Sequence, residues 1–287
     1  MTVVLTRDAA AWPSALDDAS PAVSSLYVLG DPDILRPPVC SVVGTRLCTD
    51  YGVRVTTQLV ESLALAGVGI VSGLARGIDA AAHRAALAVG GRTIAVLGTG
   101  VDVPYPAGHR ALHAEIAARG AVISENRPGT PALRGCFPKR NRIIAALSPV
   151  TVVVEAGFRS GAQSTASAAL DIGRAVAAVP GPIDSPQSEG TNALIADGAH
   201  VVTCAGDVFA LLRLAPPPAE RVEQRLDADA LAVWKALSNG ALRCEDVAAV
   251  ADLPLPRALS AVSDLEGAGH VSVGLDDCVR RVIPMSR

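Results

Sequence analysis

The sequence predicts an α/β protein, in which a doubly wound, mostly parallel sheet is followed by a small C-terminal winged-helix domain. Short apolar runs alternate with segments of helical periodicity about 10–15 residues long, which is typical of parallel strands joined by crossover helices. Half of the 287 residues are hydrophobic and only 3% are aromatic, so small aliphatic side chains must fill a large layered core. Residues 227–287 show a different pattern, three helices and two short strands.

Each strand of the sheet is predicted from an apolar, β-branched run that ends at glycine, proline or a polar residue. These runs lie at 26–29, 39–44, 68–72, 93–97, 121–124, 150–155, 176–179 and 200–203. Helices are predicted between them at 50–65, 78–89, 111–118, 163–172 and 192–197. The first helix has Asp50 as a candidate N-cap and Val55, Leu59 and Leu63 at helical spacing.

Composition predicts four segments along the chain. They are a proline-marked lead-in at 1–37, the sheet domain at 38–210, a linker with three consecutive prolines at 211–226, and the winged-helix domain at 227–287. Within the last segment we expect helices at 227–238, 244–251 and 255–267, and strands at 271–273 and 279–283.

The overall composition gives no sign of a membrane or secreted protein. No window holds the roughly 18 uninterrupted apolar residues that a membrane span needs, and the N-terminus lacks a signal-peptide pattern. The six cysteines form no CxxC pair, so we expect reduced thiols and a cytoplasmic location. The formal net charge of −3 gives no global basic field, and any contact with nucleic acid must come from a local patch.

The carboxyl ends of parallel strands share one edge of a sheet, where open α/β folds bind their ligands. Gly44, Thr45 and Arg46 follow the strand predicted at 39–44 in the way that a phosphate-binding loop would. Neither GxGxxG nor GxxxxGK[ST] is present there, so a nucleotide cofactor or nucleoside triphosphate hydrolysis is poorly supported.

A basic loop followed by a short helix is predicted before the strand at 150–155. Residues 126–154 contain no acidic residue but five basic ones, namely Arg127, Arg134, Lys139, Arg140 and Arg142. The stretch is either a solvated charged loop or an anion site that Arg46 joins from another strand end. We favour the anion site because the loop also carries Phe137, which could stack on a nucleobase, although the ring could equally anchor the loop.

The segment 155–165 offers a second anion site. Ser160 and Gly161 would leave free backbone N–H groups at the start of a helix, a ready cradle for phosphate, and Ser160 could also simply cap that helix. Glu155 could act as a general base, but we expect it to accept hydrogen bonds from loop N–H groups or from a ligand.

Two pairs of residues spaced four apart were considered as metal ligands, Asp79 with His83 and His109 with His113. No third ligand accompanies either pair, so we predict no metal site and favour a surface or capping role.

In the C-terminal domain acidic residues outnumber basic ones, and the third helix offers Arg257 against Asp264 and Glu266. This charge pattern favours protein contact or regulation over binding of duplex DNA.

At this point the residues resemble the DprA/Smf family of bacterial DNA-processing proteins. The matching motifs follow the family's order between about residues 27 and 210. They are SVVGTR at 41–46, VSGLARGIDAAAH at 71–83, GRTIAVLGTG at 91–100, FPKRNRIIA at 137–145 and RSGAQST at 159–165. The tail is similar to the winged helix that many members carry. Many members also begin with a helical domain, which we expect to be absent here because only about 25 residues precede Leu26.

The resemblance implies an extended Rossmann-like fold without an enzymatic cofactor. It further implies single-stranded DNA binding, self-association into dimers, and loading of a RecA-class recombinase during natural transformation. The family's DNA-binding positions correspond to Gly44, Thr45, Arg46, Arg134, Phe137, Arg140, Asn141, Glu155, Ser160, Gly161 and Thr165, to which the basic stretch adds Lys139 and Arg142. The resemblance does not explain the chemistry of the motif at 73–83. We expect this motif to shape either the rim formed by the strand ends or the dimer.

The leading hypothesis is therefore a non-catalytic protein that binds single-stranded DNA, with no catalytic residue, metal ion or cofactor and no membrane association. Two alternatives remain. One is a nucleotide-processing enzyme similar to the lysine-decarboxylase-like phosphoribohydrolases, in which Glu155 would act. Their usual PGGxGT loop is replaced here by EAGFRSG at 155–161. The other is a transcription factor that binds duplex DNA through the tail.

Overall fold

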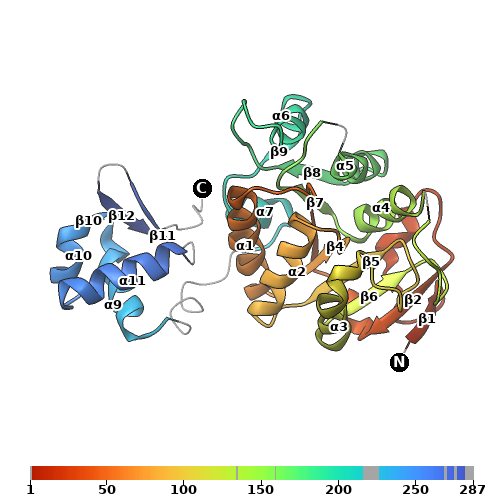
Figure 1. The fold of residues 1–287 in the computed structure, drawn as a ribbon, viewed down its shortest axis with the longest axis horizontal. Coiled ribbons are helices and arrows are strands. Elements are labelled where there is room, and N and C mark those ends of the chain that lie inside the picture. The colour runs from red at the N-terminus through yellow and green to blue at the C-terminus, as the bar shows by residue number, and fades with distance from the viewer. Residues whose placement is uncertain are drawn as a thin grey trace. The chain divides into compact units, whose positions relative to one another are not determined.

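The computed structural model describes residues 2–133, 135–158, 160–215, 226–267, 270–274 and 277–281. The chain divides into two compact units, Met1–Ala215 and Pro216–Arg287, each of which is described by itself (Figure 1). No helix of the described residues is long and apolar enough to cross a bilayer.

The first unit is built on a nine-stranded sheet with the order β1-β2-β6-β5-β4-β3-β7-β8-β9. Its strands from β3 to β9 run parallel to one another, and β2 pairs antiparallel with both β1 and β6. The predicted α/β fold with a mostly parallel sheet is confirmed. The strands are β1 (Thr2–Thr6), β2 (Ser25–Gly30), β3 (Val39–Val43), β4 (Gly69–Ser72), β5 (Thr93–Leu97), β6 (Ala121–Ser124), β7 (Val150–Val153), β8 (Ala175–Ala178) and β9 (His200–Val201).

The N-terminal residues differ from the sequence prediction. Residues 1–37 were set apart as a lead-in, but β1 and β2 extend the sheet beyond β6 by antiparallel pairing. The strand β1 was not predicted because it lies at the sheet edge, where only Leu5 is buried. An edge strand with one buried residue leaves no apolar run to recognise.

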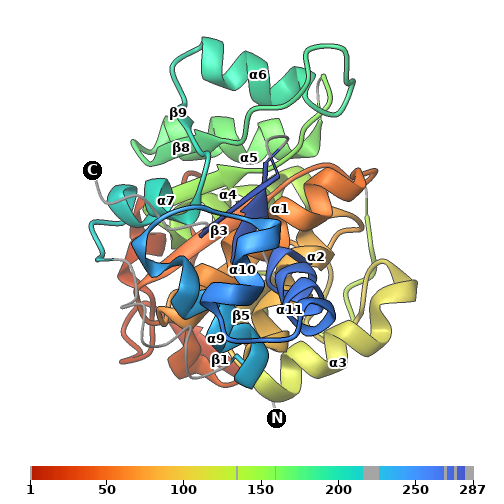
Figure 2. The same ribbon diagram turned by 90° about the vertical axis from the view of Figure 1, so that its left-hand side faces the viewer.

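Helices cover both faces of the sheet. Successive strand residues point to opposite sides, and because both sets are apolar, each face must be buried. Val42, Ile70 and Val152 pack against one set of helices, and their neighbours Val43, Val71 and Val153 pack against the other. The first face carries α1 (Asp50–Leu65), α2 (Ile78–Ala88) and α7 (Ala205–Leu211), with α3 (Arg110–Arg119) beside α2. The second face carries α4 (Cys136–Leu147) and α5 (Gly161–Asp171) (Figure 2).

Shorter elements complete the first unit. The 3-10 turns are η1 (Ser14–Asp18), η2 (Pro32–Leu35) and η3 (Ala107–His109), and η1 packs on α4. The helix α6 (Glu189–Ala196) packs on β8, near the edge of the sheet that β9 forms (Figures 1 and 2). The helix α7 was not predicted, and its last residue, Leu211, had been assigned to the linker.

The order of the strands places a topological switch point, where the direction of strand addition reverses, at the centre of the sheet. From β3 the chain proceeds through β4, β5 and β6 in one direction, whereas β7, β8 and β9 follow on the other side of β3. Adjacent β3 and β7 therefore form the topological switch point, with Val43 opposite Val153. Ligands of open α/β sheets bind in the crevice outside the carboxyl ends of such strands.

The described residues of the second unit form three helices and a small antiparallel sheet, the arrangement predicted for a winged helix. The helices are α9 (Ala228–Ala236), α10 (Cys244–Val250) and α11 (Leu255–Gly267), with the 3-10 turn η4 (Leu237–Asn239) after α9. The strand order is β10-β12-β11, for β10 (Leu242–Arg243), β11 (Val271–Val273) and β12 (Cys278–Arg281). The strand β10 was not predicted, and residues 282–283 of the expected last strand lie outside the described residues.

The core of the second unit is centred on Trp234. Its ring is almost fully buried among Val233, Val262 and Leu265, and the guanidinium carbon of Arg281 lies 4.2 Å from the ring centroid. A cation–π contact of this kind fixes the last described strand against α9.

The surface or capping role predicted for His83, which lies in α2, was wrong. The imidazole is fully buried, with Nδ1 2.7 Å from Thr93 Oγ1. Burial lowers the pKa of His83 to about 3, and the positive charges of Arg140, His109 and Arg84 act in the same direction.

Acid should therefore destabilise the fold through His83. Its ordinary pKa near 6.5 holds in the unfolded chain, so between about pH 6.5 and pH 3 the unfolded state binds one more proton than the folded state. Unfolding free energy should fall by up to about 1.4 kcal/mol for each pH unit in this window. Urea midpoints at pH 7, 6, 5 and 4 should show a shallower decline for His83→Gln than for the wild type. The raised pKa of Asp79 acts in the opposite sense in both proteins. Equal slopes for the two proteins would contradict the assignment.

Candidate nucleic-acid interface

The loop after β3 lies at the switch point and is fastened to the end of β7. Thr45 N donates to Glu155 O at 2.7 Å, and Val154 N donates to Val43 O at 3.1 Å. Gly44 is held so tightly that a Cβ atom there would overlap the side chain of Ile78. Glycine is thus required for β3, β7 and the start of α2 to meet at this point.

A second loop, residues 73–77, closes over the first. Gly77 has a φ of +75°, and a Cβ atom there would overlap the carbonyl oxygen of Thr45. Ile78 N donates to the same oxygen at 3.2 Å, so α2 begins directly on the loop that carries Thr45 and Arg46.

Asp79 explains why the motif at 73–83 contains an acid. Its buried carboxylate accepts hydrogen bonds from Gly73 N at 3.1 Å and from Ala75 N at 3.3 Å. Burial raises the pKa of Asp79, and the positive charge of Arg140 opposes that rise. The motif therefore shapes the rim, which is one of its two expected roles, by holding the loop around a buried charge pair.

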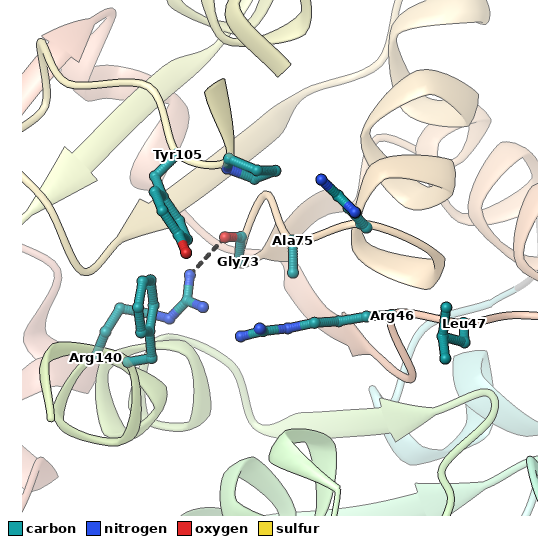
Figure 3. A pocket seen from close by; sticks show the side chains of 9 residues that line it. Arg46, Leu47, Gly73, Ala75, Tyr105 and Arg140 are labelled. Carbon is teal, nitrogen blue, oxygen red and sulfur yellow. Dashed lines mark hydrogen bonds between the residues drawn. The ribbon is translucent and has the colours of Figure 1, made fainter. Parts of the chain in front are cut away.

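Arg140 is the other member of this pair. The residue is only 7% exposed, and its guanidinium donates to the carbonyl oxygen of Gly73 at 2.6 Å (Figure 3). It also donates to the carbonyl oxygen of Val96. Burial lowers the pKa of Arg140 to about 10, the nearby Asp79 charge raises it, and the Arg46 charge lowers it. The side chain is locked in place by backbone carbonyls, although part of it still lines the groove described below.

The basic stretch forms a helix where a loop was expected. Gly135, with a φ of +86°, precedes α4, and Phe137, Arg140 and Arg142 all lie within the helix. Pro138 is accommodated because it occupies the first helical turn, where the backbone N–H has no intrahelical partner to lose. Helical periodicity then buries Arg140, Asn141 and Arg142.

Lys139 and Arg142 are directed away from the groove. Both Arg142 Nη2 contacts with the carboxylate oxygens of Glu125 are 2.8 Å, and Lys139 Nζ lies 3.6 Å from the same carboxylate. Neither residue lines the cavities at the strand ends. Arg134, a further predicted site residue, lies outside the described residues.

Phe137 is half buried and lies between two further groups. Its ring centroid is 5.1 Å from that of Tyr105, with the planes tilted by 34°, and 5.8 Å from the guanidinium carbon of Arg46. The structure thus brings Arg46 and Phe137 together as predicted. Sequence reasoning missed Tyr105, whose only signal is an isolated aromatic residue in the loop after the strand at 93–97.

The start of α5 forms the far wall. Asn141 Nδ2 donates to Gly161 O at 3.2 Å, and Thr165 Oγ1 lies 3.5 Å from the same oxygen. Ser160 occupies the N-cap position of α5, but its side chain makes no capping hydrogen bond, so the structure does not support the alternative in which it simply caps the helix. Its buried hydroxyl oxygen has no partner among the described residues.

Glu155 lies beneath the groove and does not line it. Only 2% of the residue is exposed, and its carboxylate accepts from Thr49 N at 2.9 Å and from Thr49 Oγ1 at 2.5 Å. These bonds fasten the N-terminus of α1, with Thr49 and not Asp50 as its N-cap. The expectation that Glu155 accepts hydrogen bonds from loop N–H groups is confirmed.

Two adjoining cavities make up the groove. The larger, about 490 Å³, runs from Gly44, Thr45 and Arg46 to Ser160, Gly161 and Thr165. The smaller, about 320 Å³, lies toward Tyr105, Arg76 and Pro106. Both are lined by Arg46, Leu47, Ala75, Phe137 and Arg140, so they share a wall. We call the two together the strand-end groove.

The fold and this groove define a Rossmann-like protein with a groove lined by cations and aromatic rings at its switch point. A model of one family, described as DNA recombination-mediator protein A, matches residues 3–213. The chain belongs to this family.

Several relatives are similar over most of the chain. The putative DNA processing protein DprA of Mycobacterium tuberculosis (strain ATCC 25618 / H37Rv) is 43% identical over 254 residues, which cover 85% of this chain and 65% of that relative. Protein Smf of Escherichia coli is 44% identical over 201 residues, covering 70% of this chain and 54% of the relative. The chain thus spans about two thirds or less of the length of these relatives.

Solved structures of two relatives share the fold. DNA processing protein A from Streptococcus pneumoniae matches with a TM-score of 0.70 and 41% identity, covering 72% of this chain and 73% of that one. DNA processing protein A from Helicobacter pylori, reported for its single-stranded DNA binding mode, matches with a TM-score of 0.68 and 30% identity. That match covers 74% of this chain and 96% of the other.

Gly77→Ala should destabilise the groove and the fold together. The left-handed conformation and the overlap with the Thr45 carbonyl should lower the unfolding free energy by at least about 2 kcal/mol. Gly108→Ala is the matched control, since Gly108 has open space around it and no positive φ. Urea denaturation of both variants checks this, and equal midpoints for the two would contradict the role given to Gly77.

Proposed function

We propose that residues 2–215 bind single-stranded DNA in the strand-end groove. The observation that carries this is the pairing of Arg46 with Phe137 at the switch point, a cation and an aromatic ring on one rim. Cations bind phosphates and aromatic rings stack on bases of any sequence, which is the usual chemistry of proteins that bind single strands. The single-stranded DNA binding mode reported for the Helicobacter pylori relative supports the same substrate.

A polymer strand fits the groove better than a reacting nucleotide does. The enzymatic alternative needs Glu155 as a base, but both carboxylate oxygens of Glu155 accept hydrogen bonds from Thr49. To reach a substrate, the carboxylate would have to give up these two hydrogen bonds, which hold the N-terminus of α1. We therefore propose a binding role without a catalytic step, metal ion or cofactor.

The site residues are proposed in two groups. Gly44, Thr45, Arg46, Phe137, Ser160, Gly161 and Thr165 line the larger cavity and are proposed to face the strand, with Arg140 and Asn141 behind them. Lys139, Arg142 and Glu155 are proposed to act only by supporting the fold, because their described contacts are with Glu125 and Thr49.

The finer role is proposed from family membership. The family's description as a recombination mediator supports assistance to a RecA-class recombinase on the bound strand, during DNA uptake, natural transformation and recombination. We further propose a cytoplasmic homodimer. Strand exchange by a recombinase on DNA already coated with a single-strand binding protein tests the first proposal, and light scattering tests the second. No stimulation of exchange, or a monomer at micromolar concentration, would contradict them.

The tail unit is proposed to contact protein. Arg257, the basic residue at the start of α11, is paired with Asp229 of α9, with Nε 2.7 Å from Oδ2. That pairing neutralises the cation that a duplex-binding helix would use. Binding of the isolated tail to duplex DNA, weakened by Arg257→Ala, would support the alternative regulator.

Removing both rim groups should abolish binding. Loss of one stacking ring costs about 1–3 kcal/mol, and loss of one phosphate contact reduces the salt slope by about 0.7. Arg46→Ala with Phe137→Ala should weaken binding of a fluorescent oligothymidylate by at least about 100-fold. Arg110→Ala removes an exposed cation from α3, outside the groove, and should bind as the wild type does. Equal binding by the double variant and the wild type would refute the proposed function.

Glu155→Gln separates the binding and enzymatic hypotheses. The single amide oxygen could accept from Thr49 N or from Thr49 Oγ1 but not from both, which should lower the unfolding free energy by about 1–3 kcal/mol. Release of base from nucleoside monophosphates should be absent in both the wild type and the variant, as measured by chromatography. Turnover by the wild type that is lost in Glu155→Gln would instead establish the enzyme.

A further inference from the structure

The smaller cavity of the strand-end groove contains residues that are not among the predicted site residues. Tyr105 and Pro106 form one side, and Arg76 lies on the loop at 73–77. None of its described lining residues carries a carboxylate, whereas Arg46, Arg76 and Arg140 each bring a guanidinium. Cations beside exposed aromatic surface suit an anionic, flat ligand.

Tyr105 is both exposed and firmly positioned. Its exposed fraction is 41%, so one part of the ring is open to the cavity while another part contacts Phe137. The loop that carries it is fastened by Thr99 Oγ1, which donates to Val103 O at 2.7 Å, and by His113 Nε2, 2.7 Å from Val101 O. A ring held in this way can stack without a large loss of conformational entropy on binding.

Arg46 connects the two cavities. In Figure 3 its side chain extends across the smaller cavity toward Arg140, while Tyr105 faces Arg140 from the other side. Arg140 is held by the carbonyl oxygens of Gly73 and Val96 and by the charge of Asp79. Arg46 and Arg76, by contrast, are exposed, which leaves them placed to bind a phosphate.

We propose that the smaller cavity binds one further nucleotide of the same DNA strand, with its base on Tyr105 and its phosphate between Arg46 and Arg76. The strand then leaves the larger cavity by crossing the edge of Phe137, through the wall that both cavities share. A volume of about 320 Å³ suits one nucleotide, since it lies at the lower limit of the roughly 300–1,000 Å³ of small-ligand sites. This inference rests on the proposed function and extends it by a defined position.

The test pairs protein variants with modified oligonucleotides. A set of fluorescent oligothymidylates carries a single abasic residue at successive positions, and anisotropy gives the affinity of each. For the wild type, one abasic position should correspond to Tyr105 and weaken binding roughly 5- to 150-fold, the range for one stacked base. Tyr105→Ala should weaken the intact oligonucleotide by the same factor and lose sensitivity to that abasic position, whereas Tyr105→Phe should retain both.

Arg76→Ala should reduce the magnitude of the salt slope by about 0.7, the amount expected for one phosphate on a single strand. Arg110→Ala should leave the slope unchanged. Thymidine monophosphate should compete only weakly with the oligonucleotide, because the proposed ligand is a segment of a strand.

The outcomes distinguish this inference from the proposed function. If Arg46→Ala with Phe137→Ala abolishes binding while the Tyr105 and Arg76 variants bind normally, the proposed function stands and the inference fails. If Tyr105→Ala and the abasic position act additively, Tyr105 only supports Phe137, and the inference also fails. Tight competition by thymidine monophosphate would overturn it in favour of a free-nucleotide site. No binding of any oligonucleotide by the wild type would overturn both.

Discussion

The groove depends on one buried cation. Arg140 lies under the rim, where its guanidinium donates to the carbonyl oxygens of Gly73 and Val96 and is stabilised by the nearby charge of Asp79. Asp79 in turn holds the N–H groups of Gly73 and Ala75. A buried charge of this kind is costly unless every partner is present, so the loop at 73–77, the end of β5 and the start of α4 must adopt one arrangement together. The exposed Arg46 and the half-buried Phe137 are positioned on that arrangement.

The positions of the acidic side chains also determine which cations of the rim remain exposed. Glu125 binds Arg142 and Lys139 on the far side of α4, and Asp79 lies under the loop. The exposed cations at the groove are Arg46 and Arg76, and the described lining of the smaller cavity, to which both belong, holds no carboxylate. A count of basic residues along the chain could not reveal this, because it treats a paired and an exposed arginine alike.

Much of the fold was predictable because parallel strands are buried on both faces. The runs at 93–97 and 121–124 match β5 and β6 in both bounds, and α1 ends at Leu65 as predicted, although Asp50 is its first residue and not its N-cap. The edge strand β1 was not predictable, since its register depends on β2 and only Leu5 is buried. In the site, Arg46 and Phe137 were predicted from strand ends and composition. Tyr105 and the pairing of Arg142 with Glu125 depend on tertiary contacts that no local pattern encodes.

The position of β7 beside β3 has a consequence for the order in which binding competence appears during synthesis. Val43 and Val153 are neighbours in the sheet but are far apart along the chain, and the groove takes its walls from residues on both sides of this pair. Pairings between such distant segments form late and cannot form while one segment is still in the ribosome. A nascent chain that has completed β3 to β6 already carries Arg46, Arg76 and Tyr105. It nevertheless has no far wall until β7 and α5 have emerged and docked, so the protein gains a complete groove only once both halves of the sheet have been made.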